Sequence, residues 1–253
     1  MRNDFAATFL DIPGLDVPGI NSVGYPLGYS RYRLQRYAYG SARDRCEVLL
    51  SRLFVCHYVD VPTVRADIEY LRDSCPDRPF VLIANRVHAD TIRWATGLRI
   101  HNLFAVPQEL PSVHRLLDRW CGSADCAQDS PARCTDYCAP ACAAKWRTFS
   151  ALAYVHRHYD SRVCVNDVAK LCSMSVSTFY RAFKAEQNMS FSDYLMCLRV
   201  HVAKLLLRHT ALPVSEVGVS VGFCDGSHFG KAFRALERVT PSDYRLSISS
   251  LKF

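Results

Sequence analysis

An internal repeat near the C-terminal end constrains this sequence more than any other feature. Residues 165–194 have the sequence VNDVAKLCSMSVSTFYRAFKAEQNMSFSDY, and residues 214–244 have the sequence VSEVGVSVGFCDGSHFGKAFRALERVTPSDY. The residues whose types return 50 positions later are Ser177, Phe179, Ala182, Phe183, Ala185, Ser192, Asp193 and Tyr194. Arg181 and Lys184 return as Lys231 and Arg234, so positive charge is repeated as well. We therefore expect two copies of one supersecondary unit.

Each copy has the pattern of two helices joined by a tight turn. In the first copy, Asn166 is expected to cap a helix that runs to about Cys172, and a second helix is expected over residues 176–187. Apolar residues in this second helix recur at intervals of three and four, which predicts one buried stripe. Polar and basic residues remain on the opposite face. This combination is typical of a helix-turn-helix motif.

A long helix is predicted between the two copies, over residues 191–208. Ser190 and Asp193 have the spacing of a capping box at its start. Thr240 followed by Pro241 predicts the start of a last helix, with threonine as the cap and proline at the first helical position. The region that holds the repeat is thus predicted to be all-α.

The region resembles the DNA-binding module of AraC/XylS-family transcription regulators. The resemblance covers about residues 146–246, and the residues that fit the family's motif are Gly222, Phe223, Ser227, Phe229, Phe233, Arg234, Thr240, Pro241, Tyr244 and Arg245. It implies that residues 146–253 form a domain in which a long helix joins two helix-turn-helix motifs. It also implies sequence-specific binding of double-stranded promoter DNA and regulation of transcription, with RNA polymerase as a second partner if the protein is an activator. The two recognition helices would enter successive major grooves, about 34 Å apart.

The resemblance also indicates which side chains face the DNA. The base-reading candidates are Ser177, Tyr180 and Arg181 in the first motif, and Gly226, Ser227, His228 and Lys231 in the second. An arginine can bind guanine O6 and N7 with two hydrogen bonds, whereas a glycine offers no side chain. Lys184 and Arg234 are placed to bind phosphates, which fix the register but carry little sequence information. The alternative is that these residues form the ordinary solvated surface of two helices.

The charge distribution agrees with a polyanionic partner for the C-terminal part. Residues 1–145 hold 17 Lys and Arg against 16 Asp and Glu, whereas residues 146–253 hold 14 against 8. No apolar run approaches the roughly 18–20 residues that a membrane span needs, and the first ten residues lack the apolar core of a signal peptide. We expect a cytoplasmic DNA-binding protein that has no enzymatic activity, no cofactor and no metal site formed by isolated histidines.

The segment 46–120 has a different pattern, in which apolar strands alternate with helices. A buried strand is predicted within residues 47–59, and two more over 80–84 and 103–106. Helices are predicted over residues 62–74, 88–96 and 110–120. This alternation indicates a parallel sheet with helices on its faces. Its second half resembles the latter part of a response-regulator receiver domain, a flavodoxin-type fold.

The residues that a receiver needs for phosphoryl transfer are not at the matching positions. Cys56, His57 and Tyr58 stand where the phosphorylated aspartate would be, Asn85 follows the next strand, and Val106 precedes the proline where a lysine would be. Asp60 is the single acidic residue nearby, and no acidic pair for Mg²⁺ is evident upstream. We therefore predict a degenerate receiver-like domain that is not phosphorylated. It is expected to form a homodimer, to bind a partner protein or to bind a ligand.

Two further segments leave alternatives open. Residues 1–45 are predicted to be loop-rich, because glycine and proline are frequent in residues 11–28. Tyrosines that alternate with arginines over residues 25–39 suit either single-stranded nucleic-acid binding or a half-buried strand or tail. The linker 121–145 contains Cys121, Cys126, Cys134, Cys138 and Cys142.

The cysteine-rich linker has three interpretations. Its thiolates suit a Zn²⁺ site, a redox-reactive cluster, or a tether without either role. The two-residue spacing that marks a zinc knuckle is missing. Some proteins join a module of the AraC type to a zinc-held cysteine that accepts alkyl groups from damaged DNA, and a DNA-repair regulator of that kind is the remaining alternative. Its cysteine spacing does not match this linker.

Overall fold

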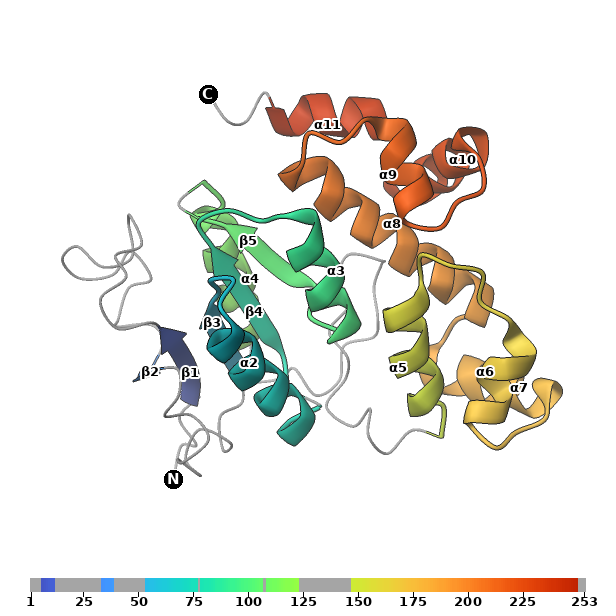
Figure 1. The fold of residues 1–253 in the computed structure, drawn as a ribbon, viewed down its shortest axis with the longest axis horizontal. Helices are drawn as coiled ribbons and strands as arrows, with labels where there is room; N and C mark the ends of the chain where they lie inside the picture. Colours follow the sequence, from blue (N-terminus) through green and yellow to red (C-terminus); the bar gives the residue numbers. More distant parts are fainter. Residues whose placement is uncertain are drawn as a thin grey trace. The chain divides into compact units, whose positions relative to one another are not determined.

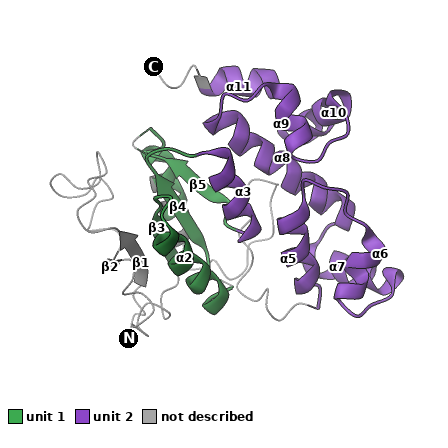
Figure 2. Cartoon of the chain, in the orientation of Figure 1, with its two compact units in different colours: residues 1–87, 100–130, 138–141 green, residues 88–99, 131–137, 142–253 purple. Residues whose placement is uncertain are grey.

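The computed structural model describes residues 6–11, 33–38, 53–76, 78–106, 108–122 and 147–249 (Figure 1). The chain divides into two compact units (Figure 2). The first contains residues 1–87, 100–130 and 138–141, and the second contains residues 88–99, 131–137 and 142–253. Each unit is described separately below.

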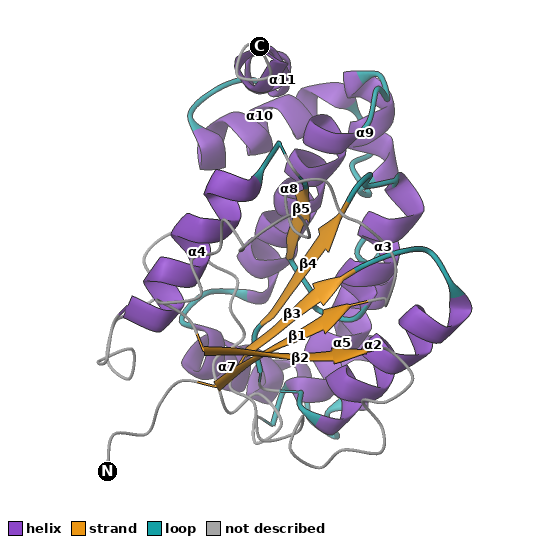
Figure 3. Cartoon of the chain, turned by 90° about the vertical axis from the view of Figure 1, so that its left-hand side faces the viewer, coloured by secondary structure: helices purple, strands orange, loops and turns teal. Residues whose placement is uncertain are grey.

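A five-stranded parallel sheet forms the framework of the first unit. Its strands are β1 (Ala6–Asp11), β2 (Arg33–Ala38), β3 (Leu53–His57), β4 (Phe80–Ala84) and β5 (Asn102–Ala105), in the order β2-β1-β3-β4-β5. Phe54 lies opposite Phe80, and Val81 lies opposite Asn102. The arrows of the strands point the same way in Figure 3, so their carboxyl ends share one edge. This strand order is that of flavodoxin-type folds.

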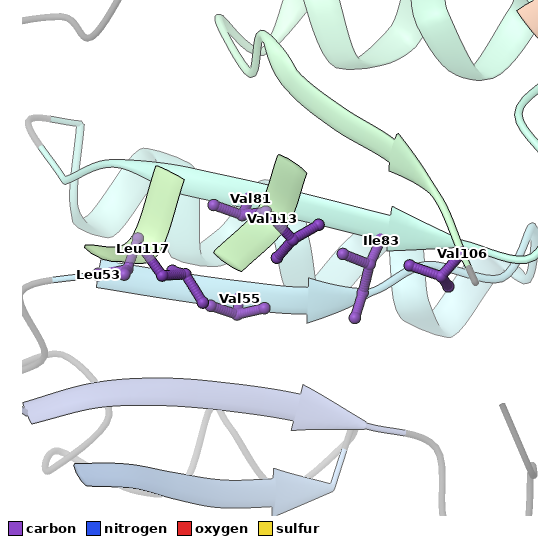
Figure 4. Packing of buried hydrophobic residues seen from close by; sticks show 7 residues of the cluster. All are labelled: Leu53, Val55, Val81, Ile83, Val106, Val113 and Leu117. Atoms are coloured by element: carbon purple, nitrogen blue, oxygen red, sulfur yellow. The ribbon is translucent and has the colours of Figure 1, made fainter. Parts of the chain in front are cut away.

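Helices pack on both faces of this sheet because β3 and β4 are buried on both sides. On one face, Val113 and Leu117 of α4 (Leu110–Gly122) pack with the buried strand residues Leu53, Val55, Val81 and Ile83 and with Val106 (Figure 4). On the other face, the rings of Phe54 and Phe80 lie 4.7 Å apart. Arg72 of α2 (Pro62–Ser74) places its guanidinium carbon 4.2 Å from the centre of the Phe80 ring, so α2 covers this face.

The prediction of a parallel sheet is confirmed, and the sheet includes two strands from residues 1–45, the segment predicted to be loop-rich. The glycine- and proline-containing residues 12–28 on which that prediction rests lie outside the described residues. Part of the tyrosine- and arginine-containing run forms β2. β1 pairs with β2 on one side and with β3 on the other. These partners are far away in the sequence, so no local pattern indicated the pairing. β2 is an edge strand, a position where charged residues such as Arg33 and Arg36 are common.

The described part of the second unit is entirely helical, which confirms the predicted all-α domain with two helix-turn-helix motifs and a long joining helix. Its helices are α3 (Ala89–Gly97), α5 (Phe149–His158), α6 (Val165–Leu171), α7 (Val176–Gln187), α8 (Phe191–His209), α9 (Val214–Ser220), α10 (Gly226–Glu237) and α11 (Pro241–Ser249). α3 packs against α5 and α8 within this unit. The guanidinium carbon of Arg99 lies 4.5 Å from the centre of the Phe149 ring.

Two other observations concern the described residues alone. None of their helices has the length and apolar character needed to cross a membrane. They contain no cluster of three or more histidine, cysteine, aspartate or glutamate side chains arranged to hold a metal ion. Within the cysteine-rich linker, Cys121 belongs to the last turn of α4, and Cys126, Cys134, Cys138 and Cys142 lie outside the described residues.

Candidate nucleic-acid interface

In the two helix-turn-helix motifs, α6–α7 and α9–α10, the C-terminus of the first helix is capped in the same way. Each first helix is followed by a residue with a left-handed backbone, with φ of 54° at Ser173 and 90° at Gly222. The N–H of this residue donates to the carbonyl three positions back, at 2.9 Å in the first motif and 3.0 Å in the second. The next N–H donates to the carbonyl five positions back, at 3.0 Å in both motifs. This paired closure caps a helix C-terminus, so both second helices start from matching turns.

The second helices also begin and end alike. Ser175 caps α7 and Asp225 caps α10, and each side chain accepts a hydrogen bond from the N–H three residues further on, at 3.3 Å and 2.7 Å. Each helix ends at a residue with a left-handed backbone, with φ of 55° at Asn188 and 66° at Arg238. The repeat seen in the sequence is therefore also a repeat of backbone geometry.

The start of α6 differs from the prediction that Asn166 caps it. α6 begins at Val165, and its cap position is Cys164, whose side chain makes no capping hydrogen bond. The Cys164 carbonyl instead accepts hydrogen bonds from the N–H groups of Asp167 and Val168, both at 3.2 Å. Asn166 lies within the first turn of α6 and is exposed.

An aromatic core behind each recognition helix fixes its orientation. In the first motif the Phe183 ring lies 5.6 Å from Phe179, 5.3 Å from Phe191 and 5.4 Å from Tyr194. In the second, the Phe233 ring lies 5.7 Å from Phe229 and 5.5 Å from Tyr244. The four phenylalanines of α7 and α10 are at most 1% exposed. This confirms the predicted inward stripe, and such edge-on aromatic packing leaves a helix little freedom to rotate.

The residues proposed for base contact in the first motif all lie on the outer face of α7. Ser177, Tyr180 and Arg181 are exposed, as is the phosphate-binding candidate Lys184. The hydroxyl of Ser177 lies 3.2 Å from that of the capping residue Ser175. Tyr180 has 42% of its surface exposed although it is large and aromatic. The helix brings Arg181 next to Ser177 and Lys184 next to Tyr180, because residues four apart are neighbours on a helix surface.

The outer face of the second motif also carries two basic residues, and it begins with a glycine. Gly226, Ser227, His228, Lys231 and Arg234 are all exposed on α10. The His228 ring packs edge-on against the buried Phe223 at a centroid distance of 5.3 Å, which restricts its position. A side chain at Gly226 would meet nothing within 4 Å. The first turn of α10 thus exposes backbone where the first turn of α7 carries Val176.

The acidic residues of the two recognition helices are held away from these outer faces. Each helix carries one glutamate, near its C-terminal end. Glu186 accepts hydrogen bonds from the N–H groups of Arg147 and Thr148, at 3.0 and 3.1 Å, and from the Thr148 hydroxyl. Glu237 forms an ion pair with Lys204 of α8, with a 2.7 Å separation and both side chains 15% exposed. Neither glutamate was predicted from the sequence, since their partners lie more than 30 residues away.

The basic residues, in contrast, remain available on the outer faces. Within the described parts of the chain, no ion pair is formed by Arg181, Lys184, Lys231 or Arg234. Because Glu186 is hydrogen-bonded and Glu237 is ion-paired on the inner side, the basic residues on each outer face have no glutamate of the same helix beside them. Such a face attracts a polyanion.

The long helix α8 joins the two motifs. Ser190 Oγ accepts from the Asp193 N–H at 3.1 Å, which confirms that Ser190 caps α8, and it donates to Asp193 Oδ2 at 2.6 Å. The Asp193 carboxylate thus binds the serine hydroxyl, whereas in a capping box it would accept from the serine N–H. The first motif packs at the start of α8, where Phe191 contacts Phe183, and the second motif packs near its end through Lys204. The 19 residues of α8 correspond to a length of about 28 Å, close to one turn of DNA.

Comparisons with known proteins agree with this geometry. A helix-turn-helix domain model matches residues 168–247. The Msm operon regulatory protein of Streptococcus mutans is 34% identical over 96 residues, which cover 38% of this chain and 34% of that protein. The transcriptional activator RhaS of Salmonella schwarzengrund is 34% identical over 94 residues, which cover 37% of this chain and 34% of RhaS. The matched part spans about a third of the length of these curated relatives.

One solved structure is similar over most of the chain. The structure of the xylose-binding transcription activator XylR superposes with a TM-score of 0.50 and 16% sequence identity, covering 95% of this chain and 70% of XylR. At this identity the likeness concerns the fold. Since 95% of this chain is covered, the likeness includes the α/β part.

Proposed function

We propose that this chain, in which residues 168–247 form an AraC-type helix-turn-helix domain, binds double-stranded promoter DNA sequence-specifically and regulates transcription. The observation that supports this most directly is the arrangement of charge on α7 and α10. Four cations are exposed on their outer faces, while the one glutamate of each helix is bound elsewhere in the domain. A helix with a buried aromatic back and a free basic front suits the major groove.

Selection of DNA sites from a random pool tests this proposal directly. The full chain is expected to enrich sites that contain two short conserved boxes. The centres of the boxes should lie about 10–10.5 base pairs apart, because two recognition helices on one face of the duplex meet the major groove one turn apart. A pool that shows no enrichment, or that yields a single box, would contradict the proposed use of both motifs.

The proposed roles of the individual side chains follow from their positions. Ser177, Tyr180 and Arg181 of α7 would contact base edges, as would Gly226, Ser227, His228 and Lys231 of α10. Lys184 and Arg234 lie one turn closer to the C-terminal ends of their helices and would bind phosphates. Arg181 offers two donors in a planar group that matches guanine, whereas a lysine is a flexible point charge that selects less sharply.

The first motif is therefore expected to carry more of the sequence preference. Arg181→Ala should remove the preference at one base position, a loss of about 1–3 kcal/mol of discrimination. Lys184→Ala is the matched control, since it removes one positive charge from the same face and should weaken all sites to a similar extent. Site selection with both variants measures the difference. If the two variants give the same sequence logo, then Arg181 contacts a phosphate and not a base.

For the N-terminal unit we propose a receiver-like domain without phosphoryl chemistry, which would form a homodimer or meet a partner. Asp60 follows β3 at the carboxyl edge of the sheet, and its carboxylate lies 2.8 Å from Arg65 Nε and accepts from the Tyr58 hydroxyl at 3.2 Å. β1 ends at Asp11 at the same edge, and Val106 follows β5 where a lysine would be needed.

RNA polymerase would be a second partner if the protein activates transcription. The relative RhaS is named a transcriptional activator.

Phosphodonors are expected to leave DNA binding unchanged. Asp60 is already neutralised by Arg65, and the cation that would stabilise the transferred phosphoryl group is missing from the end of β5. The test compares the affinity for the selected site with and without acetyl phosphate and Mg²⁺, and it measures the intact mass of the chain. Stable addition of one phosphate at Asp60 would overturn this part of the proposal.

A further inference from the structure

We propose that Arg199 of α8 is a positioning residue that sets the spacing between the two recognition helices. The inference rests on the proposed binding of two DNA half-sites, and it adds a residue that touches neither half-site. Arg199 lies near the middle of the sequence of α8 and contacts the turns that lead into both motifs.

On the side of the first motif, Arg199 binds the backbone turn that leads into α6. Its Nε donates to the Tyr159 carbonyl at 2.8 Å, and its Nη2 donates to the Ser161 carbonyl at 2.8 Å. Tyr159 is itself buried, with 3% of its surface exposed. Two short hydrogen bonds from one planar group fix both the distance and the direction of this turn relative to α8.

On the side of the second motif, Arg199 meets the turn between α9 and α10. Its guanidinium carbon lies 5.9 Å from the centre of the Phe223 ring. A methyl group added at Gly222 would lie 3.0 Å from Nη2 of Arg199 and 2.8 Å from the Tyr159 carbonyl oxygen. Phe223 is buried and packs 5.2 Å from Phe229 of α10. One aromatic ring therefore connects the guanidinium to the second recognition helix.

The chemistry of this position explains why it is an arginine. A guanidinium can donate two hydrogen bonds in its plane and still lie over an aromatic ring, whereas an ammonium donates from a single point. Burial lowers the pKa of Arg199 from its usual value, since solvent that would stabilise the charge is excluded. The two carbonyl oxygens and the ring supply the replacement contacts. The Arg199 guanidinium thus holds the α5–α6 turn and the α9–α10 turn in fixed positions against α8.

The functional consequence concerns cooperation between the motifs. When the first motif is bound to DNA, the second has a high effective concentration at its half-site only if the spacing of the two recognition helices matches the spacing of the two half-sites. Weaker contacts between Arg199 and the two turns would lower this effective concentration without changing the outer face of α7 or of α10. Arg199 should thus control how strictly the protein requires one particular spacing.

The test uses the full chain and three duplexes, which are the selected two-box site, the same site with two base pairs inserted between the boxes, and a site that keeps one box. For Arg199→Lys we expect affinity for the two-box site to fall about tenfold, while affinity for one box stays within about twofold. The penalty for the insertion should shrink about tenfold. Phe223→Leu removes the ring beside Arg199 together with its contacts to His228 and Phe229, so it should reduce the insertion penalty as well and also lower the affinity for one box.

The matched control is Arg162→Ala, which removes one positive charge from an exposed position in the same α5–α6 turn. It should lower affinity for all three duplexes by one common factor. A merely structural role of Arg199 would lower the melting temperature and all three affinities together, and this result would overturn the proposal. If the wild-type chain itself enriches no site, then the proposed function fails, and that outcome is distinct from a change in spacing preference.

Discussion

The affinity of the protein for its DNA site is expected to fall about 10²–10³-fold when salt is raised from 50 to 200 mM. This estimate follows from four to six phosphate contacts, each of which releases counterions from the duplex. The exposed cations Lys184 and Arg234 are placed for such contacts, and the C-terminal part holds 14 basic residues against 8 acidic ones. Titration of a labelled duplex at several salt concentrations gives the slope of log affinity against log salt.

Two substitutions show whether the slope comes from the proposed face. Lys184→Gln should reduce its magnitude by about 0.9, the value for one lost phosphate contact. Lys204→Gln also removes one positive charge, but Lys204 is paired with Glu237 and only 15% of its side chain is exposed. This control should lower the melting temperature and leave the slope unchanged. If the affinity for DNA does not change with salt concentration, then the proposed binding of phosphates is wrong.

A segment of residues 146–253 should bind with the same slope, since both motifs and α8 are contained in it. The second compact unit also includes α3, which packs on α5 and α8. Removal of α3 exposes apolar surface on these helices, so we expect the segment to melt at a lower temperature than the same helices in the full chain. A segment that is unfolded would contradict the predicted domain boundary at residue 146.

The helical part of the fold was predictable because its signals are local. Ser190, Pro241 and the spacing of Phe179 and Phe183 each act within one or two turns, and the predicted range of α7 agrees with the structure. The outward positions of the candidate DNA-contacting residues follow from the same periodicity. The roles of these residues in base or phosphate contact remain predictions.

The missed features depend on contacts between distant residues. β1 belongs to the sheet because residues 53–56 pair with it, and the sequence of Ala6–Asp11 alone does not identify that partner strand. Glu186 is held away from the outer face of α7 because Thr148, 38 residues away, binds it. Arg199 looks like any basic residue of an amphipathic helix until the carbonyls of Tyr159 and Ser161 are brought beside it. In each case the determining interaction is tertiary.

Gly222→Ala is expected to destabilise the DNA-binding unit by about 2–4 kcal/mol, which combines left-handed backbone strain with overpacking. Gly222 has a φ of 90°, which a residue with a Cβ rarely adopts. The added methyl would lie 2.8 Å from the Tyr159 carbonyl oxygen, a backbone atom that cannot rotate away. For a domain of this size the melting temperature should fall by roughly 10–20 °C, as measured by circular dichroism at 222 nm.

Gly230→Ala is the matched control, because it adds the same methyl group eight residues away in the same motif. Gly230 lies within α10, and a methyl group there would meet nothing within 4 Å. Alanine is the better helix former by about 0.5–1 kcal/mol, so this variant should be more stable than the wild type. We therefore expect the free energy of unfolding to fall for Gly222→Ala and to rise for Gly230→Ala. If Gly222→Ala is also neutral or stabilising, then the α9–α10 turn can move away from Tyr159, and the contacts of Arg199 around it do not hold the two motifs at a fixed spacing.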